Sequence, residues 1–217
     1  MNKKLIAISF VLTALIALAS CGGAVKYPNY YALHVPPPPD PPAEEGVRAS
    51  LAVREFRSPT YLHQGAIVYK ASPEQIGFYN FHRWATDPRE VVTSAVADRL
   101  RASGNLTEVK LYDGRSDVDY VLSGRIDKLE EVDYEGAVKV EVAISAQMTN
   151  LRTGAQVWTN SVSEQATVEH REHRGIAAVV SSMNQTLERA IEKLLTPSLA
   201  TATTTDNRSV EGTAKSK

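Results

Sequence analysis

The sequence predicts an α+β fold (or an α/β sandwich), with one mixed, largely antiparallel sheet and two helices packed on one face of it. Short runs with the composition or the alternation of strands recur along the middle of the chain. Only two segments repeat apolar residues at the spacing of an amphipathic helix. Few of the expected strands are separated by helices, so a continuous parallel βαβ series is not expected.

The first half of the folded region is expected to hold three strands and a helix. The strands are predicted over residues 51–56, 66–69 and 75–81. Asp87-Pro88 then begins the helix, because Asp is a good N-cap acceptor and proline suits the first helical position. Glu90 lies three residues after the cap, as in a capping box. Gly104 ends the helix, because glycine readily adopts a positive φ.

Four strands and a second helix are expected in the second half. The strands are predicted over residues 106–112, 118–129, 138–148 and 157–168. Apolar and polar residues alternate most regularly from Val138 to Met148, which is typical of a half-buried strand. The loop at 150–154 predicts a hairpin with the strand that follows. Between Gly175 and Leu195 an apolar stripe at helical spacing predicts a helix docked on the sheet.

Composition excludes several classes of function. The chain has 217 residues, which suits one ordinary domain with tails. Its 24 Lys and Arg residues balance 25 Asp and Glu residues, which argues against a nucleic-acid partner. The single cysteine excludes an intramolecular disulfide framework and a thiolate-rich zinc site.

The N-terminus has the features of a secretory signal peptide over residues 1–20. Lys3 and Lys4 form its basic part, and residues 5–19 form an uncharged, mostly apolar run. This run is shorter than the roughly 20 residues that span a bilayer comfortably. Small residues then precede Cys21.

Leu18-Ala19-Ser20-Cys21 resembles the lipobox of bacterial lipoproteins. The resemblance implies cleavage before Cys21 and acylation of its sulfur and its new amino group, which would hold the protein firmly at a membrane. In enteric bacteria, an Asp directly after the lipidated cysteine resembles an inner-membrane retention signal. This chain has Gly22 at that position, so the signal is absent. In a source with two membranes, this favours the periplasmic face of the outer membrane. The alternatives are a plain signal peptide with an incidental cysteine, or an uncleaved anchor helix.

The rest of the chain is expected to divide into a tether, a domain and a tail. Residues 21–46 are interpreted as the lipidated cysteine and a Pro-rich tether, because the prolines within 36–42 favour extended polyproline II. An alternative is that residues 30–33 form a short strand docked on the domain. The domain itself is expected over 47–197. Residues 198–217 are rich in Thr, Ala and Ser and are expected to be disordered.

One aromatic segment is the candidate partner interface: Phe78, Tyr79, Phe81, Arg83 and Trp84. If the segment is a regular strand, Phe78 lies on one face and both Tyr79 and Phe81 lie on the other. One aromatic face can pack in the core, and the other then needs a helix, a subunit or a partner protein to cover it. Tyr and Trp beside Arg are typical of interaction hot spots. The alternatives are that both faces are internal, or that Trp84 packs beneath the helix that begins at Pro88.

No catalytic, cofactor or metal site is predicted. The chain lacks a phosphate-binding glycine loop, a dinucleotide fingerprint and a nucleophile elbow. His170 and His173 have a spacing that suits a metal on a helix, but the interleaved Arg171 and the missing third ligand favour a solvated turn. Glu130 and Glu131 are expected at a solvated strand end.

Five segments, in this order and spacing, resemble the ABC-type transport auxiliary lipoprotein family. They are Tyr-Tyr-Ala-Leu at 30–33, Ile-Val-Tyr-Lys at 67–70, Ile-Gly-Phe-Tyr-Asn-Phe-His-Arg-Trp-Ala at 76–85, Asp-Tyr-Val-Leu-Ser-Gly-Arg-Ile at 119–126 and Thr-Gly-Ala-Gln-Val-Trp at 153–158. The third is the most specific, whereas the last two also resemble segments of other envelope lipoproteins. The resemblance covers roughly residues 30–195.

The resemblance implies a non-catalytic role beside an MCE-domain (mammalian-cell-entry) protein and an ABC transporter permease and ATPase. Such systems move lipid or other hydrophobic molecules between membranes, and the lipoprotein docks its partners there. The resemblance also suggests a homo-oligomer. The alternative is a free-standing periplasmic carrier or sensor for a hydrophobic ligand. An envelope enzyme ranks below both, because it needs a polar constellation that the sequence does not display.

Overall fold

The computed structural model describes residues 26–38, 47–115, 117–134, 136–169 and 175–196. The predicted signal peptide (1–20), the lipidated Cys21 and the predicted tail (198–217) lie outside the described residues, as do His170 and His173.

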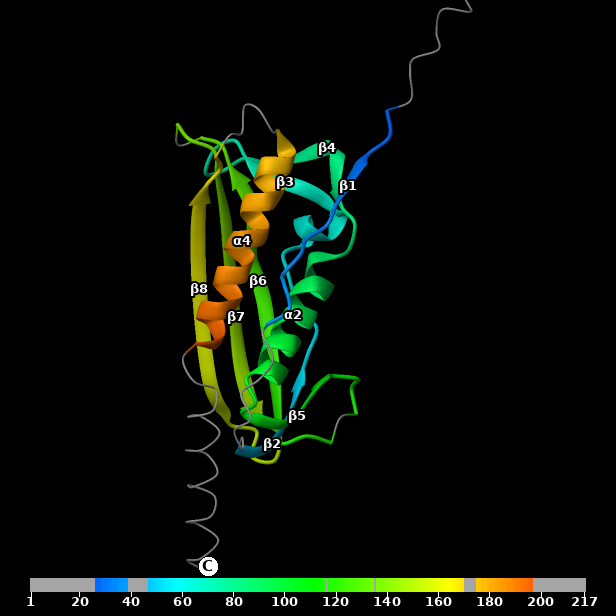
Figure 1. Ribbon diagram of the computed structural model, residues 1–217, viewed down its shortest axis with the longest axis vertical. Coiled ribbons are helices and arrows are strands. Elements are labelled where there is room, and N and C mark those ends of the chain that lie inside the picture. Colours follow the sequence, from blue (N-terminus) through cyan, green and yellow to red (C-terminus); the bar gives the residue numbers. More distant parts are fainter. Residues whose placement is uncertain (1–25, 39–46, 116, 135, 170–174, 197–217) are drawn as a thin grey trace, which may run out of the picture.

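One mixed sheet of eight strands and two α-helices make up the described fold (Figure 1), which confirms the predicted α+β class. In chain order the elements are β1 (Asn29–Tyr31), β2 (Val47–Val53), the 3₁₀ helix η1 (Thr60–Gln64), β3 (Ala66–Lys70), β4 (Ile76–Trp84), α2 (Pro88–Ala102), β5 (Leu106–Leu111), β6 (Tyr120–Val132), β7 (Lys139–Asn150), β8 (Gln156–Thr167) and α4 (Ile176–Leu195).

The long strand β6 organises the sheet. On one side it pairs antiparallel with β7, which pairs antiparallel with β8, and the predicted hairpin loop joins these two. On the other side its first residues pair parallel with β2, and its last residues pair parallel with β3. The sheet therefore forks into two arms. One arm continues from β2 to β5, and the other continues from β3 to β4 and β1.

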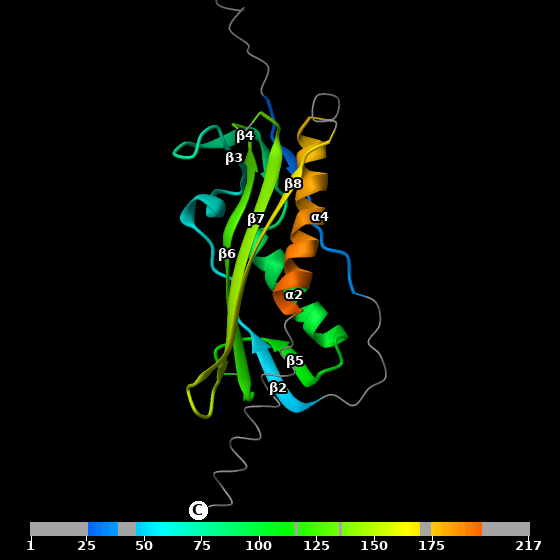
Figure 2. The same cartoon turned by 90° about the vertical axis from the view of Figure 1, so that its left-hand side faces the viewer.

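Both helices cover the same face of the sheet, as predicted (Figure 2). Helix α4 packs on β7 and β8, whereas α2 packs on β5 and β2. The predicted apolar stripe of α4 faces inward, and Met183, Leu187 and Ile191 are completely buried. Each such side chain contributes about 1.5–3 kcal/mol by its burial. The core between the two layers is thus filled by side chains.

The segment that begins at β1 belongs to the folded domain. Asn29, Tyr30 and Tyr31 pair parallel with the end of β4. The next residues run over α4, where the amide of His34 donates to Oδ1 of Asn184 at 3.1 Å, and Leu33 is buried. The structure therefore contains the docked strand that was the alternative interpretation near residues 30–33. The prolines within 36–42 consequently link β1 to β2 and do not separate Cys21 from the domain.

Helix α2 begins and ends as predicted. Oδ1 of the N-cap Asp87 accepts a hydrogen bond from the amide of Arg89 at 2.9 Å. The same carboxylate pairs with Nη2 of Arg89 at 2.6 Å. Hydrogen bonds from the Arg89 side chain are the largest cause that lowers the pKa of Asp87 below its usual value of 3.8. After the C-cap Ser103, Gly104 adopts a φ of 66°.

We predict that Asp87→Ala lowers the free energy of unfolding by about 1 kcal/mol at pH 7, because the cap acceptor is lost. A lowered folded-state pKa means that the ionised carboxylate stabilises the fold above about pH 4. This contribution disappears as the pH falls through the folded-state pKa, so the difference from the wild-type protein shrinks in acid. Urea unfolding at pH 7 and in steps below pH 4 measures both effects. Asp87→Asn, which keeps an acceptor, is the control; an equal loss in both variants would contradict the capping role.

Candidate interaction surface

The five residues of the predicted interface lie on one strand, β4, but in different surroundings. Trp84 is only 5% exposed and belongs to the core. Phe78 and Tyr79 are half-buried and pack against the core. Phe81 is 36% exposed, and Arg83 is also exposed. Two of the five side chains, Phe81 and Arg83, are therefore directly accessible.

Regular alternation separates Phe81 and Arg83 from Trp84, and an irregularity in β4 separates Tyr79 from Phe81. Ala66 pairs with Arg83 and Val68 pairs with Phe78, so the stretch of β4 between them is longer than the facing stretch of β3. Strict alternation was expected to place Tyr79 and Phe81 on one face. In the structure Tyr79 instead contacts His82, with ring centroids 5.6 Å apart, while the Phe81 ring lies 5.1 Å from Nζ of Lys26.

An aromatic cluster joins β1, β3 and β4 beneath this surface. The ring of Tyr31 lies 5.5 Å from His82, and the ring of Tyr79 lies 5.0 Å from Tyr69. The Tyr31 hydroxyl and Nδ1 of His82 form a hydrogen bond of 3.0 Å. The hydroxyl of Tyr79 donates to Oε2 of Glu131 at 2.8 Å. Tyr79 thus ties the surface strand to the middle of the sheet.

Glu130 and Glu131 are both completely buried, so the expectation of a solvated strand end was wrong. Around Glu130, the hydroxyl of Tyr61 donates to Oε2 at 3.3 Å and Nζ of Lys70 lies 3.5 Å from Oε1. Burial, followed by the neighbouring Glu130, raises the pKa of Tyr61 to about 12. Tyr61 and Lys70 belong to η1 and β3, which are far from Glu130 in the sequence. No local sequence pattern could therefore predict that Glu130 is buried.

We predict that Tyr79→Phe lowers the free energy of unfolding by about 2 kcal/mol, because a hydrogen bond to a buried carboxylate is lost while the ring contacts remain. Urea unfolding followed by circular dichroism measures the loss. Tyr30→Phe is the control, because the Tyr30 side chain is exposed. A Tyr79→Phe variant as stable as the control would show that the Tyr79 hydroxyl does not support the fold.

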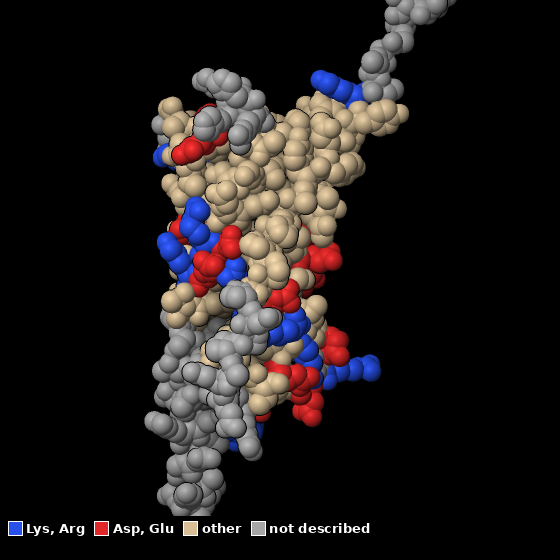
Figure 3. Space-filling view, in the orientation of Figure 1, with Lys and Arg blue, Asp and Glu red and all other residues tan. Residues whose placement is uncertain are grey.

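The surface around β1 and β4 carries few charged groups. Residues 27–38 and the first half of α4, residues 176–187, contain no Asp, Glu, Lys or Arg. Figure 3 shows the resulting uncharged region over β1, β4 and the upper half of α4. We call this region the uncharged surface. The other half of the helical layer is rich in ion pairs, such as Arg99 with Glu192 at 2.7 Å and Lys193 with Glu164 at 2.7 Å.

Two exposed residues of the uncharged surface were not among the predicted interface residues. Tyr27 is 78% exposed and Tyr30 is 65% exposed. The sequence places both within the predicted tether of residues 21–46, with a docked strand at 30–33 as the alternative for Tyr30. Tyr27 and Tyr30 lie on either side of Pro28 in the sequence. They were the signal that could have identified these residues as part of the surface.

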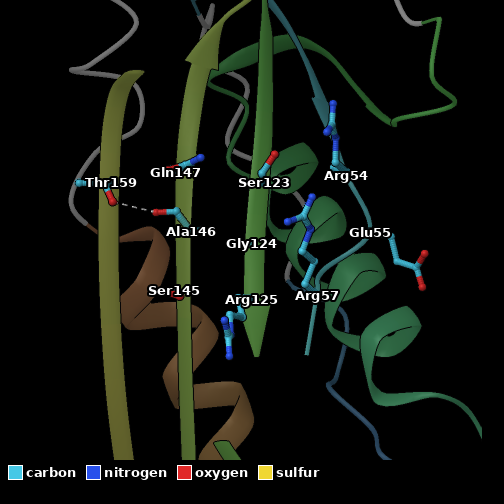
Figure 4. Close-up of a pocket in the computed structure, with 10 residues that line it drawn as sticks. All are labelled: Arg54, Glu55, Arg57, Ser123, Gly124, Arg125, Ser145, Ala146, Gln147 and Thr159. Carbon is cyan, nitrogen blue, oxygen red and sulfur yellow. Dashed lines mark hydrogen bonds between the residues drawn. The ribbon is translucent and has the colours of Figure 1, made fainter. Parts of the chain in front are cut away.

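A second candidate site is a cavity of about 420 Å³ on the face of the sheet opposite the helices (Figure 4). Arg54, Arg57 and Arg125 line it, together with Ser, Thr, Gln and Glu side chains. In Figure 4 the three guanidinium groups point in different directions, and Arg125 is paired with Asp127 at 3.1 Å. The cavity therefore offers neither an apolar enclosure nor converging charges.

Within the described ranges, no group of three His, Cys, Asp or Glu side chains comes together in a way that could hold a metal ion. Among the described helices, none is both long enough and apolar enough to cross a membrane.

Comparison with known proteins identifies a family. The family model described as "ABC-type transport auxiliary lipoprotein component" matches residues 31–194. No curated protein sequence matches the chain.

The chain is similar to several solved structures, and those with a TM-score above 0.5 share its fold. A crystal structure of a Xanthomonas campestris protein has a TM-score of 0.69 at 18% identity, and covers 83% of this chain and 99% of its own. An uncharacterised protein has a TM-score of 0.58 at 15% identity, with coverages of 77% and 95%. A PelC dodecamer from Paraburkholderia phytofirmans has a TM-score of 0.46 at 17% identity, with coverages of 73% and 92%.

Proposed function

Because the chain belongs to the ABC-type transport auxiliary lipoprotein component family, we propose that it is a non-catalytic docking component of a system that moves lipid or another hydrophobic solute between membranes. In this proposal its partners are an MCE-domain protein and the permease and ATPase of an ABC transporter. Cys21 carries the acyl chains, and the protein faces the periplasm from the outer membrane. Self-association stays a prediction.

The uncharged surface is the observation that carries this proposal. Protein interfaces are depleted of charged residues at their centre and enriched in aromatic residues and Arg. Phe81 and Arg83 are exposed residues of β4, and the first half of α4 carries no charged residue, whereas ion pairs gather in the other half of the helical layer. We propose that the partner contacts Phe81 and Arg83 of β4 and the first half of α4.

The alternative of a free-standing carrier finds less support. A carrier of a hydrophobic ligand needs an enclosed and mostly apolar cavity. The cavity on the open sheet face is lined by charged and polar side chains. The space between the sheet and the helices is occupied by buried side chains such as Leu122, Ile144 and Met183. Docking therefore agrees better than carriage with the described part of the chain.

We predict that a photo-crosslinking amino acid at position 81 or 181 captures the MCE-domain protein in intact cells, because Phe81 of β4 and Ser181 of the first half of α4 are both exposed. Mass spectrometry identifies the captured protein. Position 111 is the matched control, because Leu111 is an exposed apolar residue of β5, in the other arm of the sheet. Failure to capture an MCE-domain protein at 81 and 181, or equal capture at 111, would contradict this docking site.

A further inference from the structure

The beginning of the described chain is held against the domain. β1 pairs with β4 from Asn29 onward, and Nζ of Lys26 lies 5.1 Å from the centre of the Phe81 ring. The peptide amide of Ala85 donates to the carbonyl of Tyr31 at 2.9 Å and closes this pairing. The position of residue 26 is thus set by the fold, and not by a long linker.

This attachment keeps the first described residues, Lys26 to Tyr30, close to the membrane. We call this part of the domain the corner. The argument rests on the proposed acylation of Cys21, which puts that residue at the bilayer surface. Five residues from Cys21 to Lys26 span about 18 Å at most when fully extended, and eight residues to Asn29 span about 28 Å. The Pro-rich run adds nothing to this distance, because it follows β1.

The corner has the chemistry of a membrane interface. Tyr27 and Tyr30 are the two most exposed of the large apolar or aromatic residues named above, and Lys26 is exposed beside them. Tyrosine has an apolar ring and a polar hydroxyl, and it is enriched at the level of lipid headgroups. The lysine ammonium attracts anionic headgroups. The segment from 26 to 38 contains no acidic residue that would oppose this attraction.

The corner also lies at one end of the molecule. In Figures 1 and 2 the described chain begins at one end of the long axis, and α4 ends toward the opposite end. The arm formed by β2 and β5 lies toward that opposite end as well. A bilayer at the corner therefore leaves the ion-paired half of the domain in water.

We propose that Lys26, Tyr27 and Tyr30 contact the phospholipid bilayer and, together with the acyl chains, fix the orientation of the domain on the membrane. The tyrosine rings enter the headgroup region and the lysine binds anionic headgroups. The long axis then points away from the bilayer. Phe81 and the first half of α4 flank the contact and stay open to a protein partner.

Depth-dependent quenching tests this proposal on the full acylated chain. Because the only cysteine is the proposed acylation site, Tyr27→Cys, Tyr30→Cys and Leu111→Cys each provide a single free thiol for an environment-sensitive fluorophore. The labelled proteins are reconstituted in vesicles of phosphatidylcholine and phosphatidylglycerol with nitroxide-bearing lipid. We expect blue-shifted and quenched emission at positions 27 and 30 only. All three positions are exposed, and unchanged thermal unfolding checks that the fold is intact.

Two results would overturn the proposal. One is emission at 27 and 30 that matches the unquenched emission at 111. The other is cross-linking of positions 27 and 30 to a protein in place of lipid. A separate arm tests the anchor: a fatty-acid label should be incorporated by the wild-type chain and lost in Cys21→Ser. If the wild-type chain incorporates the fatty-acid label but positions 27 and 30 are not quenched, only the proposed bilayer contact is refuted. If the wild-type chain incorporates no label, the proposed acylation of Cys21 is refuted.

Discussion

Trp84→Ala is expected to lower the free energy of unfolding by about 3–5 kcal/mol, the usual loss when a large aromatic side chain is removed from a core. Trp84 is buried at the end of β4, where its amide donates to the carbonyl of Gly65 at 2.8 Å and its backbone pairs with Tyr31 of β1. The cavity would therefore weaken the arm that carries β1. Urea unfolding followed by circular dichroism measures the loss.

Trp84→Phe separates packing from hydrogen bonding. Nε1 of Trp84 is buried and has no hydrogen-bond partner in the described part of the chain. Phenylalanine therefore removes some packing without breaking a hydrogen bond to the ring, and it should cost clearly less than alanine. If Trp84→Ala kept its stability but lost the cross-link at position 81, Trp84 would contact the partner after all.

The sequence predicted the elements whose signals are local. Asp87-Pro88 and Gly104 marked the ends of α2, and the structure confirms both. The alternation in residues 138–148 and the loop at 150–154 identified the hairpin of β7 and β8. Boundaries were less accurate. The strand predicted over 51–56 is β2 (Val47–Val53), because the chain leaves the regular pairing after Val53.

Features that depend on distant residues could not be predicted. The buried Glu131 accepts a hydrogen bond from the hydroxyl of Tyr79, which is 52 residues away. β1 is too short to show a period, so the sequence left open whether residues 30–33 are a docked strand or part of the tether, and the pairing with β4 decides between them. For the candidate site, the aromatic composition selected residues that all belong to β4, and their role as an interface stays a prediction. The irregularity in β4 then separated Tyr79, which packs against the core, from Phe81, which is exposed.

Gly124→Ala is expected to lower the free energy of unfolding by about 1–3 kcal/mol, because it overpacks the core. A Cβ atom at this position would lie 2.2 Å from the ring of Phe56. That ring has little room to move, since Phe56 is only 1% exposed. The amide of Phe56 also donates to Oγ1 of Thr93 at 2.9 Å, and the amide of Arg57 donates to the carbonyl of Gly124 at 2.9 Å. These hydrogen bonds hold the two backbone segments in place.

Gly77→Ala is the matched control for this steric effect. A Cβ atom there would also lie 2.2 Å from an aromatic ring, that of Tyr69, but Tyr69 is only half-buried, and the atoms in close contact are at the far end of its side chain. Gly77→Ala should therefore cost less than Gly124→Ala in the same urea titration. Combining Gly124→Ala with Phe56→Ala should cost less than the sum of the two single changes, since the overlap disappears. Strict additivity would show that the contact between Gly124 and Phe56 does not restrict this position.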